Sequence, residues 1–543
     1  MAETRKSLEK SIQKCLQDLG AGDIAFSVEH PENAVHGDYA TNAALVSTKA
    51  LRKPPMDIAE ILADRLRRDA SVADVFEKIK VEKPGFINFT FLPGFLQSSV
   101  SDIIKARDAF GKSAALKGEN INVEFISANP TGPLTLANGR GGFFGDALGN
   151  ILSFAGADVT KEYYVNDAGN QIKTLGESVL ASAGMIPAAE HHYQGAYIAD
   201  YTKEFAGELL AHAHAPEELG RKVAGALLDR HIKPSLKKAG IVFDRWTSEY
   251  ADLRKKSMVE KSLKDLGKRG FTYQKEGALW LKTSQFGDTE DRVLVRSTGS
   301  DVDYTYLAVD IAYHLAKWRR GHTKLINIWG ADHHGAVARL NAAMRMTDKS
   351  PVDVLLMQLV RLVENGIEVR MSKRTGMFVT LEELLHEVGV DVTRFFFLMR
   401  EPNSHMDFDL TLAKEYSQKN PVFYVQYAHA RLANILKKAV ETKMPKGGRR
   451  DFGRLKKKDE LAVIRKLLQF PELVEDIARS HEVHRLPMYA MDLATVFHKF
   501  YDTTRVIGED WTVSNARLGL VEATKITLGN ALKLMGVSAP ERM

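Results

Sequence analysis

The chain has 543 residues, 44% of them hydrophobic, and a formal net charge of +6, which predicts about three or four domains and permits a nucleic-acid partner. No apolar run approaches the roughly eighteen residues of a membrane helix, and Met1–Leu19 is charged throughout, so we expect a cytoplasmic protein without a signal peptide. The single cysteine, Cys15, excludes disulfides and thiolate zinc sites within the chain.

Residues 1–110 are predicted to form a separate α/β domain. Helix signals at Ser7–Leu19 and Met56–Arg68 flank the stretch HGDYATNAAL, and VEKPGFINFTFLP alternates as a strand before turn residues. Two interpretations carry equal weight for the residues His36, Gly37, Asp38 and Tyr39. They form either a structural turn that docks this domain on the core or part of a surface that binds a partner.

The stretch Ile121–Asp146 organises the rest of the chain. A β-rich apolar run, Ile121–Ile126, is stopped by the Asn, Pro and Gly residues of Ser127–Pro133, and Leu136–Asn150 is typical of a glycine-rich helix packed on a sheet. A strand, loop and helix start in this order form the usual phosphate site of an α/β domain. The first hypothesis is therefore nucleotide chemistry.

Three other interpretations of nearby residues are open. Gly139, Gly141 and Gly145 resemble a dinucleotide fingerprint, but about twelve residues separate the strand from the first glycine. Ala106–Ser113 ends like a P-loop but lacks its first glycine and the preceding strand. The glycines also fit helix packing without any ligand.

From about residue 115 to 395, short apolar runs alternate with helical stretches, which predicts a parallel sheet covered by helices in a domain spanning 111–400. ADVTKEYYV and TKLINIWG are the clearest buried strands. An insertion at about 171–300 contains a mainly helical part, Gln171–Trp246, and then a strand pair, EGALWLKTS and DRVLVRS.

Four histidines in this insertion suggest metal binding: His191, His192, His212 and His214. The second pair lies between alanines without a nearby carboxylate, so we expect surface histidines and no metal ligated by the protein.

Residues 401–543 are predicted to form a helical bundle, with amphipathic helices at Val422–Leu436, Leu461–Ile477, Met488–Tyr501 and Leu518–Leu534. The basic stretch Lys443–Lys458 fits a solvated linker and an RNA contact equally well.

Two segments carry a specific resemblance. VEFISANPTGPLTLANGRGG and RMSKRTG are similar to the two signatures of arginyl-tRNA synthetases of the bacterial type, a class I aminoacyl-tRNA synthetase family. HGDYATNAAL, YYVNDAGNQI, DYTYLAVDIAYH, INIWGADHHG, NPVFYVQYAHARLANIL and APERM are also family-like, so the resemblance covers the chain from about residue 30 to its end.

The resemblance implies a Rossmann-like catalytic domain with a helical insertion, an N-terminal domain that binds the tRNA elbow, and an all-α domain that binds the anticodon. The implied reaction ligates L-arginine to its tRNA through arginyl-adenylate, with ATP as substrate and Mg²⁺ on its phosphates. The family is commonly monomeric.

The resemblance implies that Lys373 is the cation that contacts the leaving pyrophosphate and that Ser372 supplies hydrogen-bond donors in the same loop. Where the family usually has His-x-Gly-His, this chain has Thr135, Leu136, Ala137 and Asn138. Thr135 and Asn138 retain donors for phosphate oxygens but carry no positive charge. The alternative hypothesis is therefore an RNA-binding or regulatory protein with impaired amino-acid activation.

The acidic residues of the chain also indicate which amino acid is bound. Carboxylates bind a guanidinium best, so an arginine pocket needs buried acids. Glu124 is a charged residue inside an apolar strand. Asp310 lies in an apolar helix, and Tyr306, four residues earlier, is on the same face of that helix. A structural lysine or arginine paired with Glu124 is the competing interpretation.

The remaining assignments follow from the resemblance. The ATP-binding residues are expected to be Pro130, Thr131, Gly132, Pro133, Leu134, Leu136, Ala137, Gly139, Asp332, His334, Met371 and Gly376. The arginine-binding residues are expected to be Glu124, Ser127, Asn129, Tyr306, Asp310 and His333. Stacking and phosphate contacts with tRNA are expected from Phe423, Tyr427 and Arg431.

Overall fold

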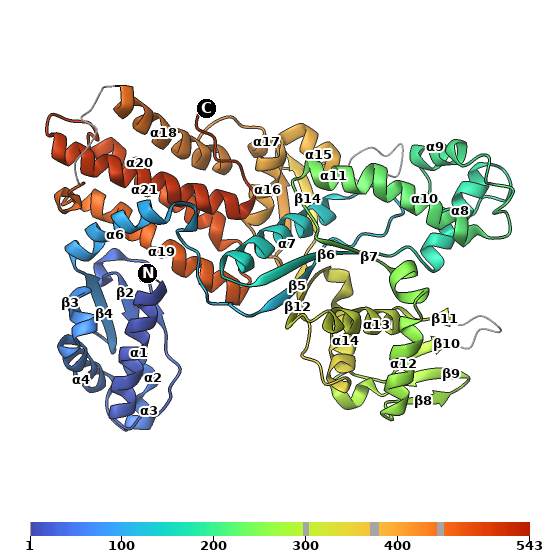
Figure 1. Ribbon diagram of the computed structural model, residues 1–543, viewed down its shortest axis with the longest axis horizontal. Helices are drawn as coiled ribbons and strands as arrows, with labels where there is room; N and C mark the ends of the chain where they lie inside the picture. Colours follow the sequence, from blue (N-terminus) through green and yellow to red (C-terminus); the bar gives the residue numbers. More distant parts are fainter. Residues whose placement is uncertain (1, 297–302, 370–379, 442–449) are drawn as a thin grey trace.

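A computed structural model describes residues 2–296, 303–369, 380–441 and 450–543 of the chain. A central parallel sheet separates a helical bundle and an N-terminal domain on one side from two inserted segments on the other (Figure 1). None of the helices in these ranges is both long enough and apolar enough to cross a bilayer.

The N-terminal domain is a four-stranded antiparallel sheet covered by helices. Its strand order is β1-β2-β4-β3, and the strands are β1 Val28–Glu29, β2 Tyr39–Thr41, β3 Phe76–Glu82 and β4 Phe86–Phe91. The stretch expected to hold one strand therefore forms a hairpin. Its helices are α1 Ala2–Asp18, α2 Ala43–Val46, α3 Thr48–Leu51, α4 Pro55–Arg68 and α5 Ala70–Ala73, and the two predicted helices, now α1 and α4, are confirmed.

The HGDY residues dock this domain on the bundle. Gly37 has φ +90°, and a Cβ there would lie 2.5 Å from the Phe89 carbonyl oxygen, so only glycine fits. Asp38 accepts from the Phe91 amide and from Nε of Arg465, each at 2.7 Å. The Tyr39 hydroxyl donates to Glu472 inside the interface. Asp38 and Tyr39 thus dock the domain as one interpretation expected, although on the bundle and not on the catalytic core, and contact of this domain with the tRNA elbow stays a prediction.

The catalytic domain is built on a five-stranded parallel sheet of order β13-β12-β5-β6-β7. Its strands are β5 Asn120–Glu124, β6 Asp158–Val165, β7 Arg245–Ser248, β12 Lys324–Gly330 and β13 Asp353–Met357. The chain builds outward from β5 in both directions, so the strand order reverses between β5 and β12. Ligands of open α/β sheets bind at the carboxyl ends of the strands at such a reversal.

Helix α7, Leu136–Phe154, packs closely on this sheet because of its glycines. A Cβ at Gly145 would lie 2.3 Å from Cγ of Phe125, and one at Gly142 would lie 2.7 Å from Cδ1 of Ile126. The predicted strand, loop and glycine-rich helix are confirmed.

The insertion expected at about 171–300 is two segments, because β7 lies between them and belongs to the central sheet. The first is helical: α8 Asn170–Ser182, α9 Ala196–Glu204, α10 Pro216–Leu227 and α11 Lys233–Lys238. Helices α8, α9 and α10 share an apolar core of their own, whereas Leu236 of α11 packs in the main core. The second holds α12 Met258–Lys268 and an antiparallel sheet of β8 Thr272–Lys275, β9 Ala278–Leu281, β10 Arg292–Arg296 and β11 Asp303–Tyr304. The two predicted strands pair as β9 and β10.

Further helices cover the catalytic sheet and lead into the bundle: α13 Tyr306–Arg319, α14 His334–Met346, α15 Leu381–Val388, α16 Val390–Leu398 and α17 Leu410–Ala413. A small sheet joins β14 Val360–Glu364, β15 Ile367–Glu368 and β16 Met406–Asp409. Because β16 pairs with β14, residues 406–409 pack with the catalytic domain although 401 was expected to begin the bundle.

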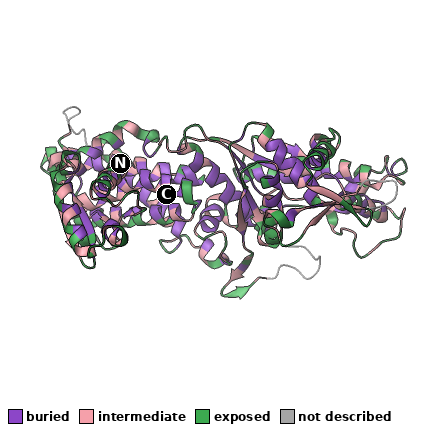
Figure 2. Cartoon of the chain, turned by 90° about the horizontal axis from the view of Figure 1, so that it is seen from below, coloured by how far each residue is buried: buried purple, intermediate pink, exposed green. Residues whose placement is uncertain are grey.

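The four predicted bundle helices are present as α18 Pro421–Glu441, α19 Lys458–Ser480, α20 Arg485–Thr503 and α21 Trp511–Met535. Helix α6, Pro93–Ala106, lies against this bundle: the Gln97 amide donates to the Leu455 carbonyl at 2.9 Å. Buried residues run through the bundle and the central sheet, and exposed residues cover the outside (Figure 2). One apolar core thus joins the N-terminal, catalytic and C-terminal parts.

Candidate active site

A cavity of about 1000 Å³ lies beyond the carboxyl ends of β5, β6 and β12, where the strand order reverses. It brings together most of the residues expected to bind ATP or the amino acid: Glu124, Ser127, Asn129, Thr131, Gly132, Pro133, Thr135, Ala137, Asn138, Tyr306, Asp310, Asp332 and His333. These residues come from β5 and its loop, the start of α7, helix α13 and the end of β12. The cavity is therefore the candidate active site.

Other expected ATP contacts do not line the cavity. Leu134 and Leu136 are buried in the apolar core, and Pro130 is also buried. A Cβ at Gly139 would lie 2.6 Å from Leu381, so this glycine lets α7 approach α15. These four residues support the loop and helix that carry the site, and their expected contact with ATP stays a prediction.

His334 begins α14 and is exposed outside the cavity lining. Met371, Ser372, Lys373 and Gly376 lie outside the described residues, as does the first half of the basic stretch 443–458. Their roles stay predictions.

Besides the exposed Asp332, three buried or half-buried carboxylates line the cavity, and two of them have a cation. Oε2 of Glu124 lies 2.5 Å from Nζ of Lys317, and Oε1 of Glu249 lies 2.7 Å from Nη2 of Arg254. The Tyr164 hydroxyl also donates to Glu249 at 2.7 Å. The competing interpretation of Glu124, a structural ion pair, is thus confirmed, although the residue still lines the cavity.

Asp310 is the third carboxylate, and among the described residues its carboxyl group takes part in no ion pair. Its pKa is raised from 3.8 to about 7, first by burial and then by the nearby Glu124 and Glu249, while the charges of Lys317 and Arg339 act in the opposite direction. A carboxyl group that is desolvated beside other acids favours a bound cation, because a cation offsets both costs. Tyr306 lies one helical turn earlier on α13 and lines the same cavity.

His314 does not supply that cation. Its Nδ1 lies 2.7 Å from the Asp310 carbonyl oxygen and its Nε2 lies 2.8 Å from Nδ2 of Asn327, a pattern that fits the neutral ring. Burial, followed by the charge of Lys317, lowers the pKa of His314 to about 3. Lys317 and Arg339 also act on the pKa of Asp310, but in the described part of the chain neither forms an ion pair with it, so a ligand cation can still pair with this carboxyl group.

The altered signature residues cap helix α7. The Thr135 amide and hydroxyl both donate to Oδ1 of Asn138 at 2.9 Å, and Thr135 Oγ1 accepts from the Asn138 amide at 3.4 Å. This capping box uses the hydroxyl proton that was expected to reach a phosphate oxygen. The Asn138 amide group keeps its Nδ2 donors for a ligand at the start of the helix, where backbone N–H groups also favour an anion.

The loop after β5 has a strained backbone. Ile126 and Ser127 have φ of +66° and +41°, a region that is unusual for a β-branched residue and typical of functional sites. Ser127 Oγ donates to Glu124 at 3.0 Å and accepts from the Tyr164 amide at 3.1 Å. The side-chain amides of Asn129 and Asn166 lie 3.1 Å apart. These contacts hold Ser127 and Asn129 at the mouth of the cavity.

Four cavity residues gave no signal in the sequence. Tyr193 and Tyr197 come from the helical insertion, and the Tyr197 hydroxyl donates to the Thr131 carbonyl at 2.9 Å. Glu249 and Arg339 come from segments without a recognisable motif. A family-wide alignment, which shows invariant positions, is the kind of signal that finds such residues.

The residues expected to bind tRNA lie on one face of α18. The rings of Phe423 and Tyr427 are nearly parallel with centroids 6.4 Å apart, and the Arg431 guanidinium lies 4.8 Å from the Tyr427 ring and donates to its hydroxyl at 2.7 Å. All three are partly exposed. They form a continuous stripe of the kind that stacks on bases.

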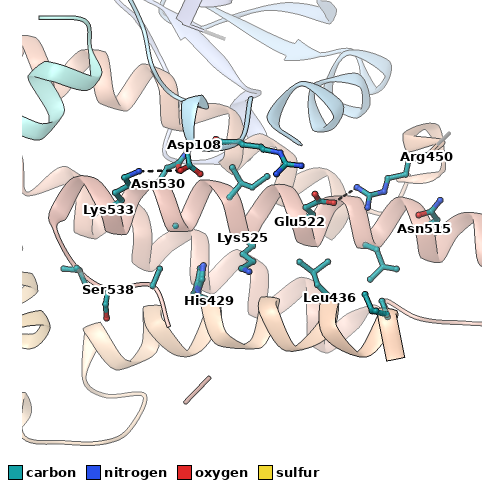
Figure 3. Close-up of a pocket in the computed structure, with 18 of the residues that line it drawn as sticks. Asp108, His429, Leu436, Arg450, Asn515, Glu522, Lys525, Asn530, Lys533 and Ser538 are labelled. Atoms are coloured by element: carbon teal, nitrogen blue, oxygen red, sulfur yellow. Dashed lines mark hydrogen bonds and ion pairs between the residues drawn. The ribbon is translucent and has the colours of Figure 1, made fainter. Parts of the chain in front are cut away.

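A second cavity, of about 1140 Å³, lies between α18 and α21 (Figure 3). Ion pairs hold several of its charged residues: Arg450 lies 2.6 Å from Glu522, and Lys533 lies 3.5 Å from Asp108. It is remote from the signature residues, so the smaller cavity is the better candidate for the chemistry.

Three family profiles match successive parts of the chain. They are "Arginyl tRNA synthetase N terminal domain" at residues 4–91, "tRNA synthetases class I (R), catalytic domain" at 99–409 and "DALR anticodon binding domain" at 425–543.

The chain is also similar to individual proteins. It is 43% identical over 558 aligned positions to the arginine–tRNA ligase of Geobacter sp. (strain M21), with 100% of both chains covered. A solved structure described as a putative arginyl-tRNA synthetase from Campylobacter jejuni has 32% identity and a TM-score of 0.75, covering 83% of this chain and 100% of that one. Thermus thermophilus arginyl-tRNA synthetase shares the fold, with a TM-score of 0.78 at 24% identity over 99% of this chain and 100% of that one.

Proposed function

The chain belongs to the arginyl-tRNA synthetase family, and from that premise we propose that it joins L-arginine to tRNA in an ATP-dependent reaction that passes through arginyl-adenylate. In the first step the arginine carboxylate attacks the α-phosphate of ATP and pyrophosphate leaves. In the second step the arginyl group passes to the terminal ribose of tRNA. Both steps need alignment and charge stabilisation more than covalent help from the protein.

The observation that carries this proposal is Asp310, a cavity acid that forms no ion pair with any residue the structure describes. Arginine brings a permanently charged, planar guanidinium that a carboxylate binds through two hydrogen bonds. Glu124 and Glu249 already have cations, so Asp310 is the acid that gains most from this group. Tyr306 on the same helix, and Ser127 and Asn129 across the cavity, are placed to contact the rest of the amino acid.

ATP is proposed to lie at the start of α7, between the β5 loop and the end of β12. The helix N-terminus and the Asn138 amide offer donors to the phosphates, Mg²⁺ accompanies the phosphates, and Asp332 lies at the strand end where a ribose is expected. Lys373 is proposed to neutralise the leaving pyrophosphate, because the replaced signature supplies no cation there.

The tRNA is proposed to contact three domains with boundaries near 1–110, 111–400 and 401–543. The stripe on α18 supports a role of the bundle in binding the anticodon stem and loop. We also propose that the enzyme acts as a monomer in the cytoplasm.

The guanidinium assignment is tested by comparing arginine with citrulline, in which a neutral urea replaces the guanidinium. Calorimetry should give an arginine affinity at least about a hundredfold above that for citrulline, corresponding to roughly 3 kcal/mol for the charge. Equal affinities would refute the charge-based pocket. Lysine, which has a cation of a different shape, should bind more weakly than arginine because it cannot form the bidentate contact.

A further inference from the structure

Glu177, His191 and His192 form a cluster in the helical insertion that the aminoacylation reaction does not use. Their candidate ligand atoms all lie within 4.8 Å of one another. Glu177 lies on α8, and the two histidines follow 14 and 15 residues later in the turn before α9. One carboxylate and two imidazoles form a donor set that Zn²⁺ accepts together with one water.

The backbone already holds these residues together. Ser178, next to Glu177, accepts from the Tyr193 amide at 2.8 Å and donates to the Thr174 carbonyl at 2.6 Å. The His192 amide donates to the Ala189 carbonyl at 3.1 Å and closes the turn. The neighbours of Glu177 and His192 are thus fixed side by side, which lowers the ordering cost of metal binding.

In the neutral ring of His192, Nδ1 is the nitrogen that carries the lone pair a metal ion needs. The Ala189 amide donates to its Nδ1 at 3.1 Å, which places the ring proton of the neutral form on Nε2. A metal bound at Nδ1 takes the place of this amide. His191 is exposed, and its ring centroid lies 4.6 Å from that of His192, so it is free to turn toward the same point.

The three donor atoms must move closer together to bind one metal ion. Donor atoms about 2.1 Å from a tetrahedral zinc ion lie about 3.4 Å from one another, so donors up to 4.8 Å apart must approach by roughly 1 Å. The competing partner of Glu177 is Lys173 at 3.8 Å, a weak and largely exposed ion pair.

The cluster is adjacent to the active-site cavity. Tyr193 follows His192 directly and lines the cavity, and Tyr197 donates to Thr131 of the signature loop. We propose that Glu177, His191 and His192 bind a divalent zinc-type ion that fixes the segment 189–197 against the mouth of the cavity. This site lies outside the arginine and ATP contacts and does not depend on the proposed reaction.

The test uses the full chain, first treated with a chelator and then titrated with Zn²⁺ in a calorimeter. We expect one zinc ion per chain in the wild type. His191→Ala and Glu177→Gln should each weaken the affinity at least about tenfold, because loss of even an outer partner of a metal ligand costs that much. Both side chains are partly or fully exposed, so the variants should fold, and circular dichroism checks this.

The matched control is His214→Ala, which removes an exposed histidine from the same insertion outside the cluster. It should bind Zn²⁺ as the wild type does. No binding by the wild type at about 100 µM Zn²⁺, or the same affinity in His191→Ala and wild type, would overturn the site.

Hydrogen exchange of residues 189–197 should slow when Zn²⁺ is added to the wild type and stay unchanged in His191→Ala. Equal exchange with and without bound zinc in the wild type would overturn the stiffening of the segment.

Discussion

Nζ of Lys317 on α13 lies 2.5 Å from Oε2 of Glu124 on β5, so one of the two acids that the sequence predicts to hold a guanidinium is already paired. Both side chains are buried. Asp310 lies two turns before Lys317 on the same helix. Because Glu124 and Glu249 are already paired, Asp310 is the cavity acid that most favours a cation from a ligand. We therefore expect the specificity of the pocket to depend on Asp310 more than on Glu124.

Replacing Asp310 by Asn keeps the shape of the side chain and removes its charge. A guanidinium that faces a neutral amide in a partly dry pocket loses about 3–5 kcal/mol, so the affinity for arginine should fall by roughly two to four orders of magnitude. ATP affinity should stay close to that of the wild type, and calorimetry with each substrate measures both. A folded variant that binds arginine normally would remove Asp310 from the pocket.

The same residue predicts how arginine binding depends on pH. The pKa of Asp310 is raised to about 7, and the ionised form is the one that binds a guanidinium. Arginine affinity should therefore fall about tenfold per pH unit below pH 7 and level off above it. In Asp310→Asn the profile should be flat over this range, and a wild-type profile that is equally flat would contradict the assignment.

The raised pKa of Asp310 has a consequence for stability as well. Because the folded-state pKa lies above the ordinary value of 3.8, the unfolded chain loses this proton first, and the contribution of Asp310 to stability declines as pH rises from about 4 to about 7. Asp310→Asn should thus melt higher than the wild type at pH 8, with a smaller difference at pH 5. A lower melting temperature of the variant at pH 8 would indicate a structural partner for Asp310.

The buried pair Glu124–Lys317 predicts a different pattern. Lys317→Met leaves Glu124 buried without a cation and should destabilise the fold by about 3–5 kcal/mol, seen in chemical unfolding. The double variant with Glu124→Gln should recover most of this loss. The double variant should lose less arginine affinity than Asp310→Asn does, and a larger loss would show that Glu124 itself holds the guanidinium.

Asn138 has two roles that one substitution separates. Asn138→Asp keeps the oxygen that caps α7, and an acid suits a helix N-terminus, so the melting temperature should not fall. The change removes the Nδ2 donor and adds a negative charge where the phosphates are proposed, so the KM for ATP should rise at least about tenfold. Unchanged ATP kinetics would place the phosphates elsewhere. Thr135→Ala, the matched control for capping, should cost about 1 kcal/mol of stability.

The elements that hold the site were predictable because their signals are local. The apolar run of β5, the glycines of α7 and the amphipathic spacing of α18 to α21 each specify structure within about twenty residues. The contacts that decide the chemistry are not local. Lys317 is 193 residues from Glu124, and no period or motif relates the two.

The sequence did not show the structural role of some residues. Thr135 and Asn138 were expected to supply phosphate donors, yet the spacing of three that places them at the site also forms a capping box. Leu134, Leu136 and Gly139 lie within the same motif but face the core. A linear motif specifies a segment, and only the fold determines which side chains of that segment line the cavity.

The most direct measurement is an aminoacylation assay with purified full-length protein, ATP, Mg²⁺ and tRNA, run in parallel with each of the standard amino acids. We expect tRNA to be charged with arginine and with no other amino acid, and we expect Lys373→Ala to lower this rate by about two to four orders of magnitude, corresponding to roughly 3–5 kcal/mol of transition-state stabilisation. Charging with a different amino acid, or no charging by a folded protein that still binds tRNA, would contradict this expectation, and the second result would favour an RNA-binding role without activation.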